Sequence, residues 1–355
     1  MEIEDLRRKI DAADSKLLEL LNSRAKLVQE VGKLKIRSGR RDFYIPHREK
    51  KIISSVVKRN GGPLEPGAVE AIYREIINAC RSLEAKLKVA YFGPEGTFTH
   101  LAAMKNFGSS GDYAPVKSIA DVFTEVEKGR AGYGVVPVEN SNEGVVNHTL
   151  DMFIESDLVI CSEINMQIEE CLLSSTGNKK DIKKVYSHAQ PLAQCRNWLE
   201  ENLPGVPVIE VSSTSVASKR AAAERGAAAI GSRAAAAIYD LEIVAGGIED
   251  SKENYTRFLV IGRNPSEASG EDKTSVMFSI KDKVGALHGM LMSFKEHKIN
   301  LTKIESRPTK KKAWEYIFFV DFLGHISDKG VQEALNELKE NCVFLKVLGS
   351  YPRAD

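Results

Sequence analysis

Apolar residues recur at alternating steps of three and four through the first part of the chain, with no proline among them. The positions are Leu6, Ile10, Ala13, Leu17, Leu20, Leu27, Val31 and Leu34, and Arg24 takes one place in the same period. This period predicts one long amphipathic helix from Ile3 to about Ser38. At about 1.5 Å per residue it would be on the order of 50 Å long, so we expect it to pair with a second copy of itself.

Two shorter helices are predicted next. Pro46 suits the first turn of a helix, and the sequence Asn60-Gly61-Gly62-Pro63 would end it. A third helix is expected from near Pro66 to about Lys86. Residues 1–86 are therefore predicted to form an all-helical unit.

From Lys88 onward, short apolar runs alternate with helical stretches, which is typical of an α/β domain. The predicted strands are KVAYFG, GYGVVPVEN, DLVICSEINM, ECLLSS, KVYSH, VPVIEV, AAIG and RFLVIG. The alanine-rich segment 217–239 is expected to hold tightly packed helix, interrupted at Ile230-Gly231-Ser232.

A polar segment, NPSEASGEDK at 264–273, has the composition of a linker. After it the predicted elements are SVMFSI, ALHGMLMSFKEH, LTKIESRP, WEYIFFVDF, VQEALNELKE and CVFLKVLGS. Their order is strand, helix, strand, strand, helix, strand, the βαββαβ pattern of a ferredoxin-like unit.

Composition narrows the choice of partners and cofactors. The chain has 50 Lys plus Arg against 49 Asp plus Glu, so a net charge of +1 favours neither nucleic acid nor an anionic membrane. With no leader-like start and no long apolar run, a cytoplasmic location is expected. The five scattered cysteines, which fit reduced structural thiols, are Cys80, Cys161, Cys171, Cys195 and Cys342. Neither a metal nor a cofactor is expected.

Two cations lie where the first helix should be apolar. Leu21, Arg24, Val28, Val31 and Lys35 share nearly one face, since 11 residues of helix return within about 20° of the start. A single cation of this kind could bury the aliphatic part of its side chain and still place its charged end in solvent. Two like charges favour an anion between them.

This segment resembles the all-helical chorismate mutases, through LRRKIDAADSKLLELLNSRAKLVQEVGKLK, IPHREKKI and IYREIINACRSLEAKL. The resemblance implies an intertwined dimer and a chorismate site that takes one arginine from the partner's helix. The matching positions are Arg7 (the partner's contribution), Arg24, Lys35, Arg48, Glu49 and Glu84. By the same resemblance, Lys35 and Glu84 would face the breaking ether oxygen.

Two positions depart from that family's pattern. Glu84 stands where many relatives have Gln, and Ile45 stands where some have Asp. A carboxyl group donates to an ether oxygen only when it is protonated. We therefore expect the mutase rate to weaken as the pH rises through the ionisation of Glu84.

The middle segment carries small polar clusters directly after predicted strands. GPEGTFTH is not a dinucleotide fingerprint. Aligned on Gly93, Pro94 takes the second position and Glu95 the third, where G-x-G-x-x-G needs its second glycine. Further clusters are VVPVENSNEGVV, YSHAQPLAQC, SSTSVA and NYTRF. Their hydroxyl and amide groups predict a pocket that hydrogen-bonds a polar anion, while His188 could be structural or a substrate contact.

Together these motifs resemble prephenate dehydratase over about residues 88–263. The resemblance implies two α/β lobes, like those of periplasmic solute-binding proteins, with prephenate between them and Thr256 as hydrogen-bond donor to the departing hydroxyl. The other implied prephenate residues are Thr97, Glu139, Asn140, Ser187, His188, Gln194, Thr214 and Arg257.

The C-terminal βαββαβ pattern, with GAL after its first strand and ESRP at the end of its second, resembles the ACT domain of prephenate dehydratases. The resemblance implies phenylalanine binding between paired domains and feedback inhibition. The implied effector residues are Gly285, Ala286, Leu287, Glu305, Ser306, Arg307 and Pro308.

The three resemblances together imply a bifunctional chorismate mutase/prephenate dehydratase with an ACT domain, forming a homodimer or higher homo-oligomer. The expected domains are 1–86, 88–263 and 274–355. Two alternatives remain: a non-catalytic amino-acid-binding or regulatory protein on the same folds, and a mutase fused to a dehydrogenase, which the missing dinucleotide fingerprint disfavours.

Overall fold

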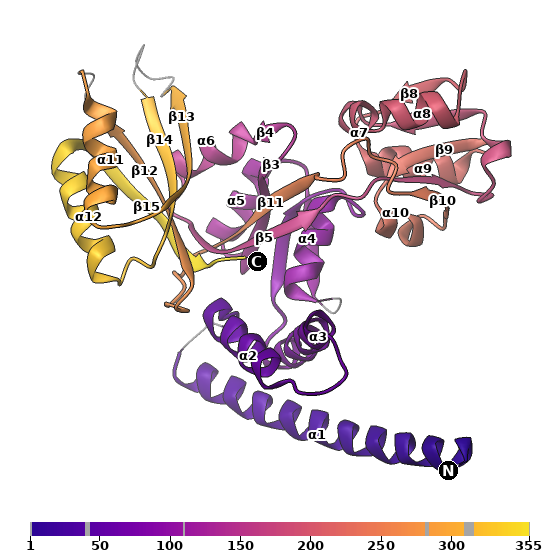
Figure 1. Cartoon of the computed structure of the whole chain (residues 1–355), viewed down its shortest axis with the longest axis horizontal. Helices are drawn as coiled ribbons and strands as arrows, with labels where there is room; N and C mark the ends of the chain where they lie inside the picture. Colours follow the sequence, from indigo (N-terminus) through magenta and orange to yellow (C-terminus); the bar gives the residue numbers. More distant parts are fainter. Residues whose placement is uncertain (1, 40–42, 109–110, 281–283, 309–315, 355) are drawn as a thin grey trace.

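A computed structural model describes residues 2–39, 43–108, 111–280, 284–308 and 316–354 of the 355-residue chain. The first unit consists of α1 (Ile3–Arg37), α2 (Pro46–Arg59) and α3 (Pro66–Glu84), as the apolar period predicts. Figure 1 shows α1 as one long helix that extends well past the short α2 and α3.

Two faces of α1 differ in their surroundings. The face toward α3 contains Leu21, Arg24, Val28, Gly32 and Lys35, all at least half-buried. Val31, predicted on this face, instead lies 45% exposed, because Gly32 takes the position closest to α3. The other face is an apolar stripe that no described residue covers, formed by Leu6, Ile10, Leu17, Leu20, Leu27, Val31 and Leu34.

The middle domain has two lobes, which Figure 1 shows well separated. The sheet of lobe 1 has the order β2-β1-β3-β11-β5, with β4 beside β3. Its strands are β1 (Lys88–Phe92), β2 (Asp112–Val116), β3 (Tyr133–Asn140), β4 (Gly144–Val145), β5 (Val159–Gln167) and β11 (Tyr255–Gly262). Its helices are α4 (Phe98–Phe107), α5 (Ile119–Glu127) and α6 (Asn147–Glu155).

Lobe 2 has a second sheet of order β10-β6-β9-β7-β8. The strands are β6 (Cys171–Ser174), β7 (Lys184–Ser187), β8 (Val208–Glu210), β9 (Ala227–Gly231) and β10 (Glu242–Gly246), joined by the 3₁₀ turn η1 (Lys179–Asp181) and the helices α7 (Ala189–Gln194), α8 (Arg196–Asn202), α9 (Thr214–Ala223) and α10 (Arg233–Ile238). The chain enters lobe 2 between β5 and β6 and leaves between β10 and β11. The alanine-rich segment is therefore only partly helical, since its centre forms the fully buried strand β9.

The C-terminal domain confirms the predicted ferredoxin-like pattern. Its elements are β12 (Asp272–Ile280), α11 (Ala286–Glu296), β13 (Leu301–Pro308), β14 (Tyr316–Leu323), α12 (Lys329–Asn341) and β15 (Cys342–Pro352). The sheet order is β13-β14-β12-β15, and α11 and α12 pack on one face. Trp314, the expected start of the third strand, lies outside the described residues.

The other face of this sheet shares a hydrophobic core with lobe 1. Met277, Phe319 and Leu348 belong to the same buried cluster as Val136 and Leu259 of lobe 1. The contact is close, since a Cβ atom added at Gly349 of β15 would overlap the Ile160 carbonyl oxygen of β5. Burial of this shared apolar surface fixes the C-terminal domain against the strands that carry the dehydratase motifs. Among the described residues, no helix is long and apolar enough to cross a membrane.

Candidate functional site

A cation and a carboxylate meet between α1 and α3. Lys35 Nζ donates to Glu84 Oε2 at 2.9 Å, and the two side chains are 17% and 10% exposed. Gly32, one turn before Lys35, allows the approach, since a Cβ atom there would lie 3.2 Å from Glu84 Cα. Among described contacts, Glu84 thus faces Lys35 as a hydrogen-bond acceptor.

Arg24 and Arg48 extend the positive character of this region. Arg24 shares the Lys35 face of α1, and its Nη1 is buried without a hydrogen-bond partner in the described part of the chain. A buried, unpaired guanidinium N–H is costly, which favours an anionic ligand there. Arg48 and Lys35 both line a cavity of about 470 Å³ at the start of α2.

Two of the implied chorismate residues make other contacts within this chain. Arg7 is 67% exposed and pairs with Glu4 at 2.6 Å. At about 1.5 Å per residue, it lies on the order of 40 Å from Lys35 along α1, so it cannot reach the site of its own chain. Glu49 pairs with Arg81 at 2.6 Å rather than with Lys35.

Arg81 is a charged group that sequence reasoning missed. It is 5% exposed and also donates to Asn78 and to the Asn106 carbonyl of the middle domain. Burial raises the pKa of Glu49, while the charge of Arg81 opposes that shift. Arg81 lies one turn before Glu84 on α3, and this spacing could have indicated from the sequence that Arg81 is buried.

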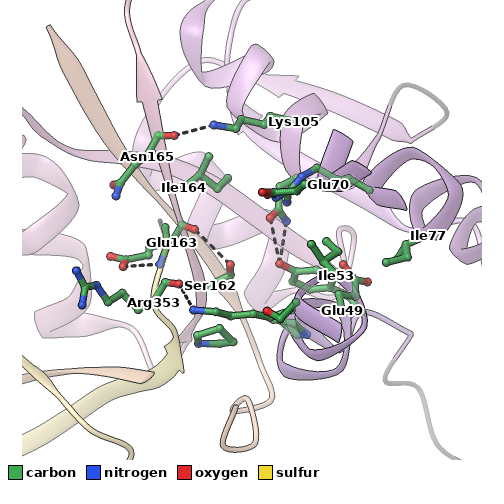
Figure 2. A pocket seen from close by; sticks show the side chains of 18 residues that line it. Glu49, Ile53, Glu70, Ile77, Lys105, Ser162, Glu163, Ile164, Asn165 and Arg353 are labelled. Atoms are coloured by element: carbon green, nitrogen blue, oxygen red, sulfur yellow. Dashed lines mark hydrogen bonds and ion pairs between the residues drawn. The ribbon is translucent and has the colours of Figure 1, made fainter. Parts of the chain in front are cut away.

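The Glu49 carboxylate lies at the edge of a junction pocket between the helical unit, lobe 1 and the C-terminal strand, which Figure 2 shows from close by. Its volume is about 190 Å³. Lys105 donates to the Asn165 carbonyl at 2.9 Å, and Lys50 donates to the Arg353 carbonyl at 2.7 Å. The Lys50 bond joins the helical unit to the C-terminal segment, whereas the Lys105 bond lies within lobe 1. The pocket does not include Lys35 or Glu84.

In the middle domain, Thr256 and Asn140 are direct partners across the β3–β11 pair. Asn140 Nδ2 donates to Thr256 Oγ1 at 2.8 Å and to Asn254 Oδ1 at 2.9 Å. Asn254 Nδ2 then donates to Gln194 Oε1 of lobe 2 at 2.9 Å. The structure thus groups three predicted residues at the crossing between the lobes, and it adds the unpredicted Asn254.

Other predicted residues lie at helix starts. Thr97 caps α4, and His188 caps α7 by accepting from the Gln190 N–H at 3.4 Å. Ser187 is fully buried at the end of β7 and donates to the His188 carbonyl, while Thr214 is the first residue of α9. His188 thus has a structural bond, and its role as a substrate contact stays a prediction.

The Gly93–Thr97 loop of lobe 1 contacts lobe 2. Ser215 and Tyr239 donate to the Glu95 carbonyl at 2.7 and 3.1 Å, and Ser232 donates to the Gly96 carbonyl at 3.0 Å. The starts of α9 and α10 in lobe 2 therefore face the end of β1 in lobe 1. Hydroxyl and amide groups predominate there, as the sequence predicts.

Glu139 and Arg257 lie outside this group, contrary to what the resemblance implied. Neighbouring residues of a strand point to opposite faces, so both are turned toward the C-terminal domain, away from Asn140 and Thr256. Glu139 accepts from Lys303 at 2.8 Å. Arg257 donates to Glu163 at 2.7 Å, to Asp321, and to the Tyr351 hydroxyl at 2.9 Å.

The two motifs of the C-terminal domain lie at one end of its sheet. Pro308 pairs with Tyr316, and Ser279 pairs with Ile317, so β12 and β13 end at the same edge. Gly285 there has a φ of 77°, a left-handed conformation that suits glycine, and begins α11. Its N–H groups and those of Ala286 and Leu287 are placed at a helix start, as predicted.

Within ESRP, alternate residues face opposite ways. Arg307 donates to Asp151 of α6 at 2.8 Å, so it contacts lobe 1, and Glu305 shares its less exposed face. Ser306 and Pro308 are exposed on the other side. One side of the ESRP motif therefore contacts lobe 1, and its other side is exposed.

Fold and sites together define a three-part enzyme in which a helical cation site, a two-lobed domain with polar residues where its lobes meet, and a ferredoxin-like domain share one chain. Residues 6–85 match the type II chorismate mutase family, residues 89–266 the prephenate dehydratase family, and residues 274–340 the ACT domain. The chain belongs to the bifunctional chorismate mutase/prephenate dehydratase family, and it has both enzymatic activities.

Relatives of the same name match along the whole chain. The protein of Aquifex aeolicus is 52% identical over 357 residues, covering 99% of this chain and 98% of the relative. That of Pseudomonas aeruginosa is 46% identical over 358 residues, with the same coverage of 99% and 98%. The crystal structure of prephenate dehydratase in complex with L-Phe from Arthrobacter aurescens has 34% identity and a TM-score of 0.70, covering 76% of this chain and 91% of that one.

Proposed function

We propose that Arg24, Lys35, Arg48 and Glu84 form the chorismate site, completed by Arg7 of a second copy. The rearrangement is unimolecular: the ether C–O bond breaks as a C–C bond forms, so the protein needs only to hold the reactive conformer and stabilise charge on the ether oxygen. Arg24 and Arg7 of the second copy would hold the two carboxylates. Lys35 and a protonated Glu84 would donate to the ether oxygen.

The exposed apolar stripe of α1 supports this proposal, because it would suit a homodimer contact. Leu17, Leu20 and Leu27 are 54%, 69% and 66% exposed, which is costly for a continuous apolar surface. Antiparallel pairing of two α1 helices would cover the stripe and bring Arg7 of each copy toward the Lys35 end of the other. Glu49, held by Arg81, would act by fixing α2 against α3.

For the second step, we propose that prephenate binds between the lobes with its departing hydroxyl at Thr256. The C–C bond to the ring carboxylate breaks to release CO₂, its electron pair enters the ring, and the C–O bond breaks. The leaving oxygen accepts a hydrogen bond from Thr256, and a proton ultimately from solvent, to leave as water. Ser187, Gln194, Thr214 and Thr97 line the approach.

We further propose that phenylalanine binds near Gly285 and Ser306 and inhibits dehydration, with domains spanning 1–86, 88–263 and 274–355. The likeness to a dehydratase solved with L-Phe supports this effector, and free N–H groups at a helix start suit its carboxylate. A cytoplasmic location stays a prediction from the sequence.

Two observations carry the assignment: the three family matches along this chain, and its full-length likeness to a bifunctional chorismate mutase/prephenate dehydratase. The test supplies chorismate without nucleotide, with and without phenylalanine, and follows prephenate and phenylpyruvate. Thr256→Val should abolish dehydration and retain mutase activity, whereas Lys35→Met should do the reverse with prephenate supplied. Equal loss of both activities in either variant would contradict the assignment of separate sites.

A further inference from the structure

The hydrogen bonds around Asn140 leave its side chain no capacity for a substrate. An amide has two N–H donors and one oxygen with two lone pairs. Both donors are used, by Asn254 and Thr256, and Asn140 Oδ1 accepts from the backbone N–H groups of Asn142 and Glu143 at 2.9 and 3.1 Å. Asn140 is 7% exposed, so its effect on catalysis must act through Thr256.

The donor-to-acceptor direction of the hydrogen bonds along Asn140, Asn254 and Gln194 is fixed at both ends of the chain of bonds. Backbone N–H groups can only donate, so they hold Asn140 Oδ1 and turn its Nδ2 toward Asn254 and Thr256. At the other end, Gln194 Nε2 donates to the Glu143 carboxylate at 3.3 Å, leaving its Oε1 to accept from Asn254. Aligned bonds of this kind polarise one another.

This direction decides where the proton of Thr256 points. Because Thr256 Oγ1 accepts from Asn140, its own O–H is directed elsewhere, and within the described residues no protein acceptor takes it. A hydroxyl whose donor remains available is what the departing oxygen of prephenate requires. An Asn140 amide turned by 180° would present an oxygen and capture this proton.

Asn254 keeps Asn140 in the required orientation. Its side chain is fully buried, so it cannot touch a substrate in the cleft. Its carbonyl accepts from the Ile168 N–H at 2.8 Å, which places it where the two connections between the lobes meet. It thereby joins Gln194 of lobe 2 to Asn140 of lobe 1.

We propose that Asn254 is a positioning residue of the dehydratase half, which holds the Asn140 amide so that Thr256 offers its hydroxyl proton to the departing oxygen. The inference rests on the proposed role of Thr256. It assigns Asn140 to positioning rather than to substrate contact.

The test compares Asn254→Leu with Asn254→Asp in the full chain, measuring kcat and KM for prephenate, mutase rate and thermal unfolding. Leucine has similar volume and removes both side-chain bonds, so kcat should fall about 10- to 100-fold with KM within about threefold, as expected for a misplaced catalytic group. Aspartate retains the acceptor for Asn140, and kcat should stay within about fivefold of wild type. A purely structural role would favour leucine in a buried site, so equal loss in both variants, or kcat unchanged in Asn254→Leu, would overturn the proposal.

Asn140→Asp gives a second test that does not depend on how Asn254→Leu folds. Its carboxylate would accept the Thr256 proton, so kcat should fall at least about 100-fold at pH 8 and recover in part toward pH 5, relative to wild type at each pH. A kcat within about threefold of wild type at pH 8 would refute the orientation argument. If Thr256→Val itself retained dehydration, the proposed function of Thr256 would fail instead, so the two failures are distinguishable.

Discussion

Arg257 offers a quantitative test of how the dehydratase strands are joined to the C-terminal domain. Its side chain is 13% exposed and lies between Glu163, 0% exposed, and Asp321, 11% exposed. Tyr351 and Lys273 complete the group, with Lys273 Nζ 2.8 Å from Glu163. Replacing Arg257 by Met keeps much of the stem volume and removes the guanidinium.

The cost follows from the charges left behind. Asp321 would lose its cationic partner, and Glu163 would keep Lys273 as a cationic partner and the bond from the Ala354 N–H. Breaking a buried ion pair by removing one partner costs about 3–5 kcal/mol, because the remaining charge stays desolvated. We expect Arg257→Met to lower the free energy of unfolding by that amount in the transition that separates lobe 1 from the C-terminal domain.

The matched control is Arg130→Met, which removes the same charge from an ion pair with Glu125 whose arginine is 50% exposed. Solvent screens an exposed ion pair, so this variant should unfold nearly as the wild type does. Urea unfolding followed by circular dichroism, at one pH and salt concentration, measures both. If the two variants lost stability equally, the buried network would not hold the domains together.

Three further predictions concern other parts of the chain. If Glu84 donates to the ether oxygen, the mutase rate should be lower at pH 9 than at pH 5, and Glu84→Gln should remove that difference; a wild-type rate that is the same at both pH values would contradict this. Burial, and the charge of Glu249, raise the pKa of Glu170 from 4.5 to about 8. Between these pH values the folded chain keeps a proton on Glu170 that the unfolded chain has released, so the free energy of unfolding should fall as the pH rises. Denaturation of the wild type at pH 5 and at pH 8 should show a loss of a few kcal/mol, and Glu170→Gln should not show it. Leu20→Glu should break the proposed homodimer, giving monomers in sedimentation, and should abolish mutase activity while dehydratase activity remains. Lys26→Glu, at an exposed position of the same helix, should have neither effect.

The helices and most strands could be predicted from the sequence, because apolar period and turn residues act locally. The βαββαβ pattern and the three-helix unit needed no tertiary information. Two edge strands, β2 and β10, escaped prediction, since neither has a buried apolar run: Asp112–Val116 and Glu242–Gly246 contain no fully buried residue. The strand predicted at AAIG, in the centre of the alanine-rich segment, is confirmed as β9, which pairs with β6 and β7.

The chemistry of the sites divides in the same way. The sequence by itself determined which residue types are present: cations on one face of α1, and hydroxyl and amide clusters after strands. Only the tertiary structure decided which of them meet. Thr256 and Arg257 are adjacent in the chain, yet the alternation of β11 turns one toward the cleft and the other toward Asp321. Asn254 and Arg81 gained their roles from partners that are 114 and 32 residues away, Asn140 and Glu49, a relation that local sequence does not encode.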